Sequence, residues 1–283
     1  MSRPLLVVLA VAFVAPFAHA DAAPEQSATA SSYDLVLNEP VTFTDTSTGG
    51  GGVAESRWTD VDGREHVGAT FVYRFAFAGN HEVGLRTTFV NGAEATMTLR
   101  VLVRAPILRG HAVAVRHGGT TMADTGEVAV SGQTTVSDSV GEVRNGALRV
   151  AALDAEVVTL DAITRDARTL ARADAGFVHV PHPLGSFRAT GVESEVIAGC
   201  SGASGVARFS QLRFNDAPLV PRGEVAPNTR LALPGGGEVV LNVQEATPYG
   251  GLSVTALRVV DPDGGVTEVA RAEGGVEHCP FPT

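Results

Sequence analysis

Hydrophobic and polar residues alternate one by one along most of the chain after residue 32. This period of two predicts β-strands that each turn one face toward a core, and turn signals recur about every ten residues, as in β-sandwiches. The clearest pair is the hairpin predicted over 83–103, in which both arms alternate and Asn91-Gly92 supplies the turn. In the first half of the chain, strands are predicted at 34–37, 41–45, 55–59, 70–75, 81–90 and 95–103.

The second half alternates in the same way, with Gly, Asn and Asp at the predicted turns. One segment, 161–175, is ambiguous because Ile163, Ala167 and Leu170 also fit one face of a helix; we favour strands there. Other strands are predicted at 111–116, 128–136, 146–160, 177–180, 187–198, 206–214, 238–243, 252–260 and 266–270. The pattern therefore predicts an all-β protein of two β-sandwich domains, the second a larger antiparallel one.

The predicted domains are 33–104 and 111–283, joined by a connector at 105–110 that contains Pro106. Residues 21–32 are small and polar, which predicts a flexible leader before the first domain. Each predicted domain is long enough to bury a core of its own.

The first twenty residues have the layout of a secretory signal peptide. Arg3 precedes an apolar run from Leu5 to Ala15, and Ala18-His19-Ala20 is an A-x-A cleavage site. The run is shorter than the roughly 18 residues that a membrane-spanning helix needs. We therefore expect cleavage near Ala20 and a secreted or cell-surface protein with no membrane span in its mature chain.

The charge balance argues against two classes of partner. The chain has 31 acidic residues against 21 basic ones, all of them arginine, and a formal net charge of −10. Nucleic acid and anionic lipid repel such a chain, so neither is expected as a partner.

Cys200 and Cys279 are the two cysteines, and in an exported protein they are expected to form a disulfide. Closing a loop of about 80 residues stabilises a fold by roughly 4 to 5 kcal/mol through chain entropy. A catalytic thiol is the weaker reading, because nothing near Cys200 would lower the pKa of its sulfur.

The first predicted domain contains the segment WTDVDG at 58–63, with the segment 38–43 upstream and the Asn91-Gly92 turn downstream. This order of motifs resembles PKD (polycystic kidney disease) domains over about residues 33–104. Thr59 and Val61 depart from the family motif, which has an Asp and a Gly there. The resemblance implies an immunoglobulin-like sandwich without catalytic machinery, used as a spacer or for adhesion.

The second predicted domain resembles the bacterial "choice-of-anchor P" secreted proteins. The resemblance rests on the order of segments at 189–194, 212–215, 227–229, 239–244 and 252–259. Val243, Thr255 and Arg258 depart from the residues usual in that family. The resemblance implies a secreted or surface β-domain and no particular activity.

Few residues suggest a functional site. Trp58 lies between polar neighbours on a predicted strand, so we interpret it as a core residue rather than an exposed platform that stacks against sugars. Weak calcium candidates are the two pairs Asp60 with Asp62 and Asp261 with Asp263, although two carboxylates are few for an ion that takes 6 to 8 ligands. Turns are the preferred interpretation of both pairs.

Motifs for catalysis or for a cofactor are weaker still. The segment 199–203 (GCSGA) is one residue short of a nucleophile elbow and precedes a strand instead of a helix. His179 and His182 lie in an extended segment, where they do not share a face as metal ligands on a helix would. We therefore expect neither an enzyme nor a cofactor.

Two hypotheses about function remain. The first is a non-catalytic secreted or cell-surface protein, in which the PKD-like domain is a spacer and the second domain contacts an envelope component or another ligand. The second is an accessory protein that binds an extracellular carbohydrate or protein polymer beside secreted hydrolases. Retention on insoluble polymers as opposed to cell envelope would discriminate between them.

Overall fold

The computed structural model describes residues 22–131, 133–145, 148–160, 167–182, 185–220, 222–233 and 236–280. All regular elements in these ranges are β-strands, which confirms the predicted all-β class. No helix in the described ranges is long and apolar enough to span a membrane. The signal peptide predicted over 1–20 lies outside them.

The chain divides into two compact units. One holds the described residues up to Ser31 together with Thr42–Tyr73 and Glu82–Arg100, and the other holds Ser32–Val41, Arg74–His81 and the chain from Val101 onward. The domain bounds 33–104 and 111–283 stay a prediction.

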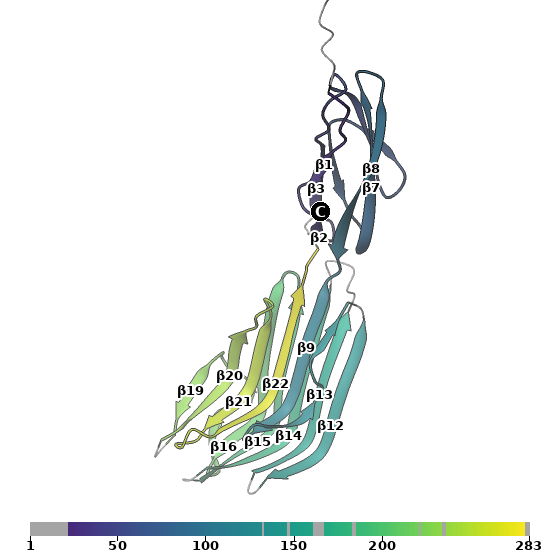
Figure 1. Ribbon diagram of the computed structural model, residues 1–283. Coiled ribbons are helices and arrows are strands. Elements are labelled where there is room, and N and C mark those ends of the chain that lie inside the picture. Colours follow the sequence, from purple (N-terminus) through teal and green to yellow (C-terminus); the bar gives the residue numbers. More distant parts are fainter. Residues whose placement is uncertain are drawn as a thin grey trace, which may run out of the picture. The chain divides into compact units, whose positions relative to one another are not determined.

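Two sheets form the N-terminal β-sandwich (Figure 1). The first sheet has three strands in the order β1-β3-β6, with β1 at Ala28–Ala30, β3 at Pro40–Asp45 and β6 at Thr70–Arg74. The second has five strands in the order β2-β8-β7-β4-β5, with β2 at Asp34–Val36, β4 at Val53–Thr59, β5 at Glu65–Val67, β7 at Gly79–Phe89 and β8 at Glu94–Arg104. The hairpin predicted over 83–103 is β7 and β8, and the turn between them is closed by the Gly92 amide donating to the Phe89 carbonyl at 2.9 Å.

The core of this sandwich is aromatic. The Trp58 ring lies with its centroid 5.9 Å from that of Phe43 and 6.3 Å from that of Phe71. Val83 and Leu85, two positions apart on β7, are buried, as their alternation predicts.

Two expectations at the edges of this sandwich were wrong. The flexible leader predicted over 21–32 is paired instead: Glu25 exchanges backbone hydrogen bonds of 2.8 and 2.9 Å with Thr48, and the Gln26 amide donates to the Leu85 carbonyl. The connector predicted over 105–110 consists only of Ala105 and Pro106, because β9 begins at Ile107 and pairs there with the last long strand. Small polar residues in the leader and a proline in the connector therefore did not indicate flexible segments.

The C-terminal sandwich consists of two seven-stranded sheets whose strand pairs are antiparallel (Figure 1). The β21 sheet has the order β10-β9-β22-β21-β20-β19, with β11 also on β9, and the β14 sheet has the order β12-β13-β14-β15-β16-β17, with β18 also on β16. The strands are β9 (Ile107–His117), β10 (Thr120–Asp124), β11 (Val128–Val130), β12 (Thr134–Asn145), β13 (Leu148–Leu160), β14 (Arg168–His182), β15 (Gly185–Gly199), β16 (Gly202–Phe214), β17 (Ala217–Val220), β18 (Gly223–Glu224), β19 (Thr229–Ala232), β20 (Glu238–Ala246), β21 (Leu252–Val260) and β22 (Val266–Glu277). The ambiguous segment 161–175 is strand in β14, from Arg168 onward.

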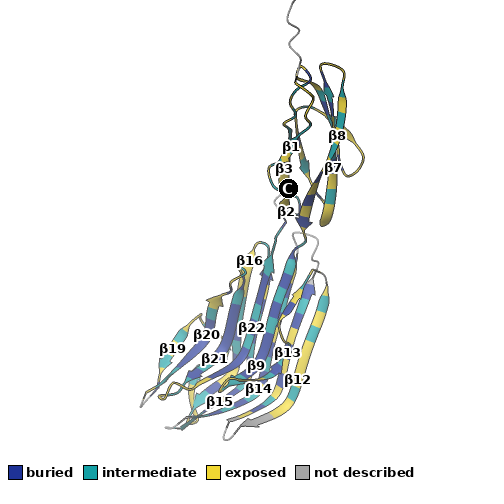
Figure 2. Cartoon of the chain, viewed as in Figure 1, coloured by how far each residue is buried: buried dark blue, intermediate teal, exposed yellow. Residues whose placement is uncertain are grey.

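One continuous core fills the space between these two sheets. Val150, Val178 and Ala189 point inward from the β14 sheet, and Leu257 and Val269 do so from the β21 sheet. Figure 2 shows the burial concentrated in β9, β22 and β21, while the edge strand β12 is largely exposed. Burial of apolar surface in this core is the main force that holds the sandwich together.

Both large sheets are interrupted along a row of small residues, which we call the bend rows. In the β14 sheet the ladder skips one position at Gly141, Ala152, Gly176, Gly191 and Ser210, which are neighbours on successive strands. In the β21 sheet it skips Ala123, Ala114, Ala270, Ala256 and Asn242. The long strands curve in Figure 1, as such interruptions of the ladder predict.

The backbone explains why these positions hold small residues. Every second strand in each row has a left-handed residue there, such as Ala152 at φ 53° and Gly191 at φ 54°. A Cβ added to Gly191 would lie 2.4 Å from the Ser210 Oγ, and one added to Gly176 would lie 2.9 Å from the Ala152 Cβ. A side chain is therefore excluded at Gly176 and Gly191, whereas Gly141 at the edge of the row has open space around it.

The bend row also shifts the alternation by one residue. Val150 and Leu153 both face the core, although they are three positions apart. As a result, outward-facing residues lie in register on both sides of the row, and these residues form the candidate site.

Candidate functional site

The outer face of the β14 sheet carries a row of three arginines and one histidine, which we call the basic row. Arg149, His179, Arg188 and Arg213 are register partners on β13, β14, β15 and β16. The row faces outward, because the residues beside it on the strands are buried in the core, namely Val150, Val178, Val180, Phe187, Ala189 and Leu212. With strands about 4.8 Å apart, the row extends roughly 14 Å across the sheet.

An aromatic side chain lies beside the basic row. Phe177 is two residues before His179 on β14, and its neighbours in register are Ala151 and Thr190. The Arg149 guanidinium carbon lies 5.5 Å from the centre of the Phe177 ring. Arg149, Phe177, His179 and Arg188 line a hollow of about 250 Å³.

The arginines of this row are paired, but at the surface. Arg149 donates from Nε to Glu142 at 2.6 Å, and Arg188 donates from Nη1 to Asp216 at 3.1 Å. The side chains of Arg188 and Asp216 are 55% and 73% exposed. Exposed ion pairs of this kind contribute about 0 to 1 kcal/mol, so a ligand can compete with them.

Carboxylates form a second row on the other side of the bend row. Asp154, Asp174 and Glu193 are register partners five residues along the strands from the basic row, a distance of about 16 Å. Burial raises the pKa of Asp174, and Glu193 and Asp154 raise it further, against the opposing effect of Arg172. Arg172 and Arg208 bridge to Glu193 at 3.3 and 3.2 Å, so this row is neutralised by its own neighbours.

A different polar cluster covers the outer face of the β21 sheet. Glu268 is buried and lies 2.8 Å from Arg258 and 3.6 Å from both Arg116 and Arg271. Arg258 also bonds to Glu245 at 3.1 Å. The arginines and glutamates of this cluster neutralise one another. Such a network is typical of side chains that hold one another in place rather than of a ligand site.

Asp60 and Asp62, the first pair of calcium candidates, accept hydrogen bonds from protein groups. Asp60 Oδ1 accepts the amides of Asp62 and Arg64 at 2.9 Å each, and Oδ2 lies 2.8 Å from His66 Nε2. Burial by itself would raise the pKa of Asp60, but these hydrogen bonds outweigh it and lower the pKa. Tyr73 on β6 donates to Asp62, so both carboxylates have partners in the same sandwich.

Asp261 and Asp263 belong to the hairpin turn between β21 and β22. The Gly264 amide donates to the Asp261 carbonyl at 2.9 Å, and the Gly265 amide donates to Asp263 Oδ1 at 3.1 Å. Within the described ranges, no group of three or more His, Cys, Asp or Glu side chains is arranged to hold a metal ion.

Trp58 and the two cysteines stabilise the fold and do not form a binding surface. Trp58 is completely buried, and its Nε1 donates to the Gly68 carbonyl at 2.9 Å, so it offers no surface to a sugar. The structure joins Cys200 to Cys279, with 5.4 Å between their Cα atoms. The bond ties the turn between β15 and β16 to the segment after β22.

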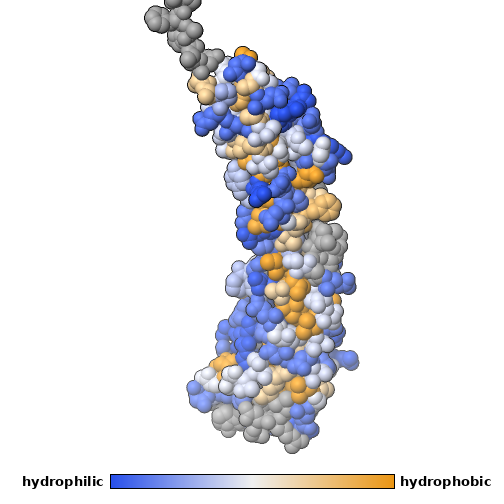
Figure 3. All heavy atoms as spheres, turned by 45° about the vertical axis from the view of Figure 1, so that its right-hand side comes forward, coloured by the Kyte–Doolittle hydropathy of each residue, from blue (hydrophilic) through white to orange (hydrophobic). Residues whose placement is uncertain are grey.

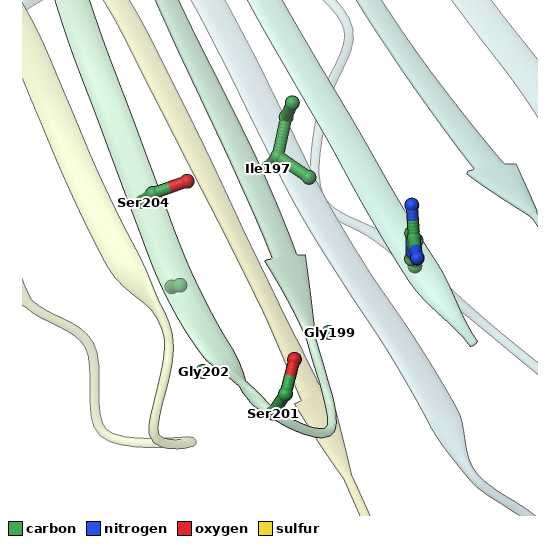
Figure 4. Close-up of a pocket in the computed structure, with 7 residues that line it drawn as sticks. Ile197, Gly199, Ser201, Gly202 and Ser204 are labelled. Atoms are coloured by element: carbon green, nitrogen blue, oxygen red, sulfur yellow. The ribbon is translucent and has the colours of Figure 1, made fainter. Parts of the chain in front are cut away.

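That turn also forms a hollow of about 310 Å³ (Figure 4). Ser201 lies at its tip between Gly199 and Gly202, with Ile197 and Ser204 farther along the two strands. Because β16 begins at Gly202, a strand follows Ser201, and the strand-turn-helix geometry of a nucleophile elbow is absent at this turn. Arg168 is the one charged residue in its lining, so the hollow has few groups that could bind a ligand or take part in a reaction.

His179 belongs to the basic row, while the side chain of His182 lies outside the described residues. Sequence reasoning interpreted His179 as a surface histidine rather than a metal ligand, and it missed Arg149, Arg188, Arg213 and Phe177. The four belong to the same face only through strand register, which alternation alone does not reveal.

The comparisons with known proteins are sparse. No family model and no curated protein matches the chain. Several solved chains match, among them one described as "Structural basis for the promiscuous specificity of the carbohydrate-binding modules from the beta-sandwich super family". It is 13% identical, with a TM-score of 0.28, over 90% of this chain and 93% of that one.

Proposed function

We propose that this is a non-catalytic extracellular binding protein that attaches to a polymer through the outer face of its β14 sheet. The observation that carries the proposal is the basic row beside Phe177: cationic side chains with exposed, replaceable partners, next to an aromatic ring and a hollow. Binding sites commonly combine an apolar surface with a few convergent polar groups in this way.

The N-terminal sandwich is proposed to be a PKD-type spacer, and the C-terminal one a domain of the choice-of-anchor P type. Complete burial of Trp58 supports the spacer role, because its ring cannot stack against a sugar. Polymer binding is therefore assigned to the C-terminal sandwich.

The distribution of hydrophobic side chains on the face shown in Figure 3 agrees with a small binding site. On the face in Figure 3, hydrophobic side chains form small groups separated by hydrophilic ones, not one continuous apolar area. Large apolar areas are typical of protein docking surfaces, and none is seen on this face.

A pull-down tests the proposal. The exported protein is incubated with chitin, cellulose, collagen, pectin and purified cell wall, and compared with the Phe177→Ala variant. We expect retention on at least one polymer and a loss of about tenfold or more in the variant, which corresponds to about 1.4 kcal/mol.

Phe77→Ala is the matched control, because Phe77 is 72% exposed and belongs to the other sandwich. Melting curves establish that both variants are folded. Equal retention of wild type and Phe177→Ala would show that this face is not the binding surface. Retention on cell wall alone would favour an envelope component as the natural ligand.

A further inference from the structure

We infer that the polymer is an acidic polysaccharide, whose chain lies across strands β13 to β16 with its carboxylate or sulfate groups on the basic row. This inference rests on the proposed function. It names the class of ligand for the same site.

The first step is the spacing of the positive charges. Arg149, His179 and Arg188 come from three adjacent strands, and Arg213 continues the row on the fourth. A linear ligand that crosses the strands meets an arginine on β13, β15 and β16 and the His179 imidazole on β14, with about 4.8 Å between neighbouring strands. Repeated single charges along a chain match this arrangement better than one compact anion does.

The second step is the chemistry of the arginines. A guanidinium presents its donors in a planar fork that fits carboxylate and sulfate oxygens in pairs. Arg149 and Arg188 already hold one carboxylate each, through a single hydrogen bond to Glu142 at 2.6 Å and to Asp216 at 3.1 Å. An incoming carboxylate makes the same contacts, and the exchanged protein carboxylates move into solvent.

The third step is the neighbouring row. Phe177 offers an aromatic ring, on which the apolar face of a sugar ring can stack, and Thr190 and Gln211 are the next residues in register. Their hydroxyl and amide groups suit sugar hydroxyls. An acidic polysaccharide can make all three kinds of contact. Its rings stack on an aromatic side chain, its hydroxyls form hydrogen bonds, and its charged groups pair with arginines.

The net charge of −10 does not prevent this binding. The acidic row lies about 16 Å away along the strands, beyond the Debye length of about 8 Å at physiological salt. Arg172 and Arg208 also neutralise part of it. The basic row is therefore the charge that a ligand senses at this place.

Affinity electrophoresis gives the test. The probes are polygalacturonate, hyaluronate and dextran sulfate, compared with methyl-esterified polygalacturonate and dextran, which have no or few charges. We expect retardation by at least one acidic polymer, none by its neutral counterpart, and weaker binding as salt rises from 50 to 500 mM.

Arg149→Gln/Arg188→Gln is the test variant, and Arg100→Gln/Arg230→Gln is its control. The control removes the same charge from exposed arginines that pair with Glu82 and Glu238 outside the site. We expect the affinity for the acidic polymer to fall about tenfold or more in the test variant and to change less than twofold in the control.

The outcomes separate the two proposals. Binding of a neutral polymer that depends on Phe177 but not on Arg149 and Arg188 would overturn the acidic ligand and keep the proposed function. Tighter binding to single-stranded DNA than to every acidic polysaccharide would also overturn the ligand class. Failure to bind any polymer, acidic or neutral, would overturn both.

Discussion

At the scale of single residues, two aromatic side chains have opposite environments. Trp58 lies between two sheets, with its ring nitrogen bonded to Gly68, while Phe177 lies on an outer face beside arginines. Sequence alternation indicated the first, because Arg57 and Thr59 are polar neighbours on the same strand. It did not single out Phe177, whose importance comes from residues on other strands.

Truncating Trp58 to alanine should destabilise the N-terminal sandwich by about 3 to 5 kcal/mol, since a large buried ring leaves a cavity. Calorimetry of the variant should show an early unfolding transition, with the transition of the C-terminal sandwich unchanged. Phe77→Ala, which removes an exposed ring, should shift neither transition. An unchanged melting profile for Trp58→Ala would contradict the core assignment.

Asp60 should make the N-terminal sandwich sensitive to acid. Its pKa is lowered in the folded state, so its contribution is complete above the ordinary pKa of about 3.9 and disappears as the pH falls through the folded value. Urea unfolding of wild type and Asp60→Asn should therefore differ at pH 7, and the difference should shrink as the pH falls below about 3.9. Asp62→Asn should retain the pH dependence of the wild type; a constant gap between wild type and Asp60→Asn would show that the carboxylate charge is not the cause.

At the scale of elements, alternation located most strands but not their full lengths or their bends. The strand predicted at 177–180 lies near the end of β14, which begins at Arg168. Six short strands, β1, β5, β10, β17, β18 and β19, were not predicted. The bend rows were invisible to sequence reasoning, because an alanine in a left-handed conformation looks like any strand alanine. Only register shows that Ala152 and Gly176 face each other at a break in the ladder.

Ala152 and Ala151 provide a matched pair for the bend row. Ala152 has φ 53°, a conformation that costs an L-residue about 1 to 2 kcal/mol and costs glycine little. Ala152→Gly should therefore leave the stability unchanged or raise it by up to about 1 kcal/mol, whereas Ala151→Gly, in ordinary strand conformation, should lower it by about 0.5 to 1 kcal/mol. Denaturant midpoints of the C-terminal sandwich measure both, and equal losses in the two variants would contradict the left-handed backbone at Ala152.

At the scale of the whole molecule, the chain combines two sandwiches, one disulfide and an excess of acidic residues. The disulfide followed from the count of cysteines and the expected compartment, whereas the binding face required strand register. Composition indicated repulsion of anionic partners, yet register gathers Arg149, Arg188 and Arg213 on one face. Net charge is a property of the sum and does not describe a local surface.

The bond between Cys200 and Cys279 closes a segment with a sequence separation of 79. Replacing both cysteines with serine should destabilise the C-terminal sandwich by about 2 to 5 kcal/mol, because the unfolded chain gains freedom. Thermal unfolding with and without reductant checks this, and the serine variant should not respond to reductant. Equal melting temperatures for the oxidised wild type and the variant would show that the bond adds no stability.

The central claim is that the outer face of the β14 sheet is the binding surface. Mapping backbone amide chemical shifts with an acidic oligosaccharide tests it directly, because each strand reports separately. We predict that the largest changes occur around Arg149, Phe177 and Arg188, and that Glu268 on the β21 sheet and Gly84 in the N-terminal sandwich are unaffected. Changes centred on Glu268 or Gly84, with the signals of Phe177 unmoved, would contradict the account.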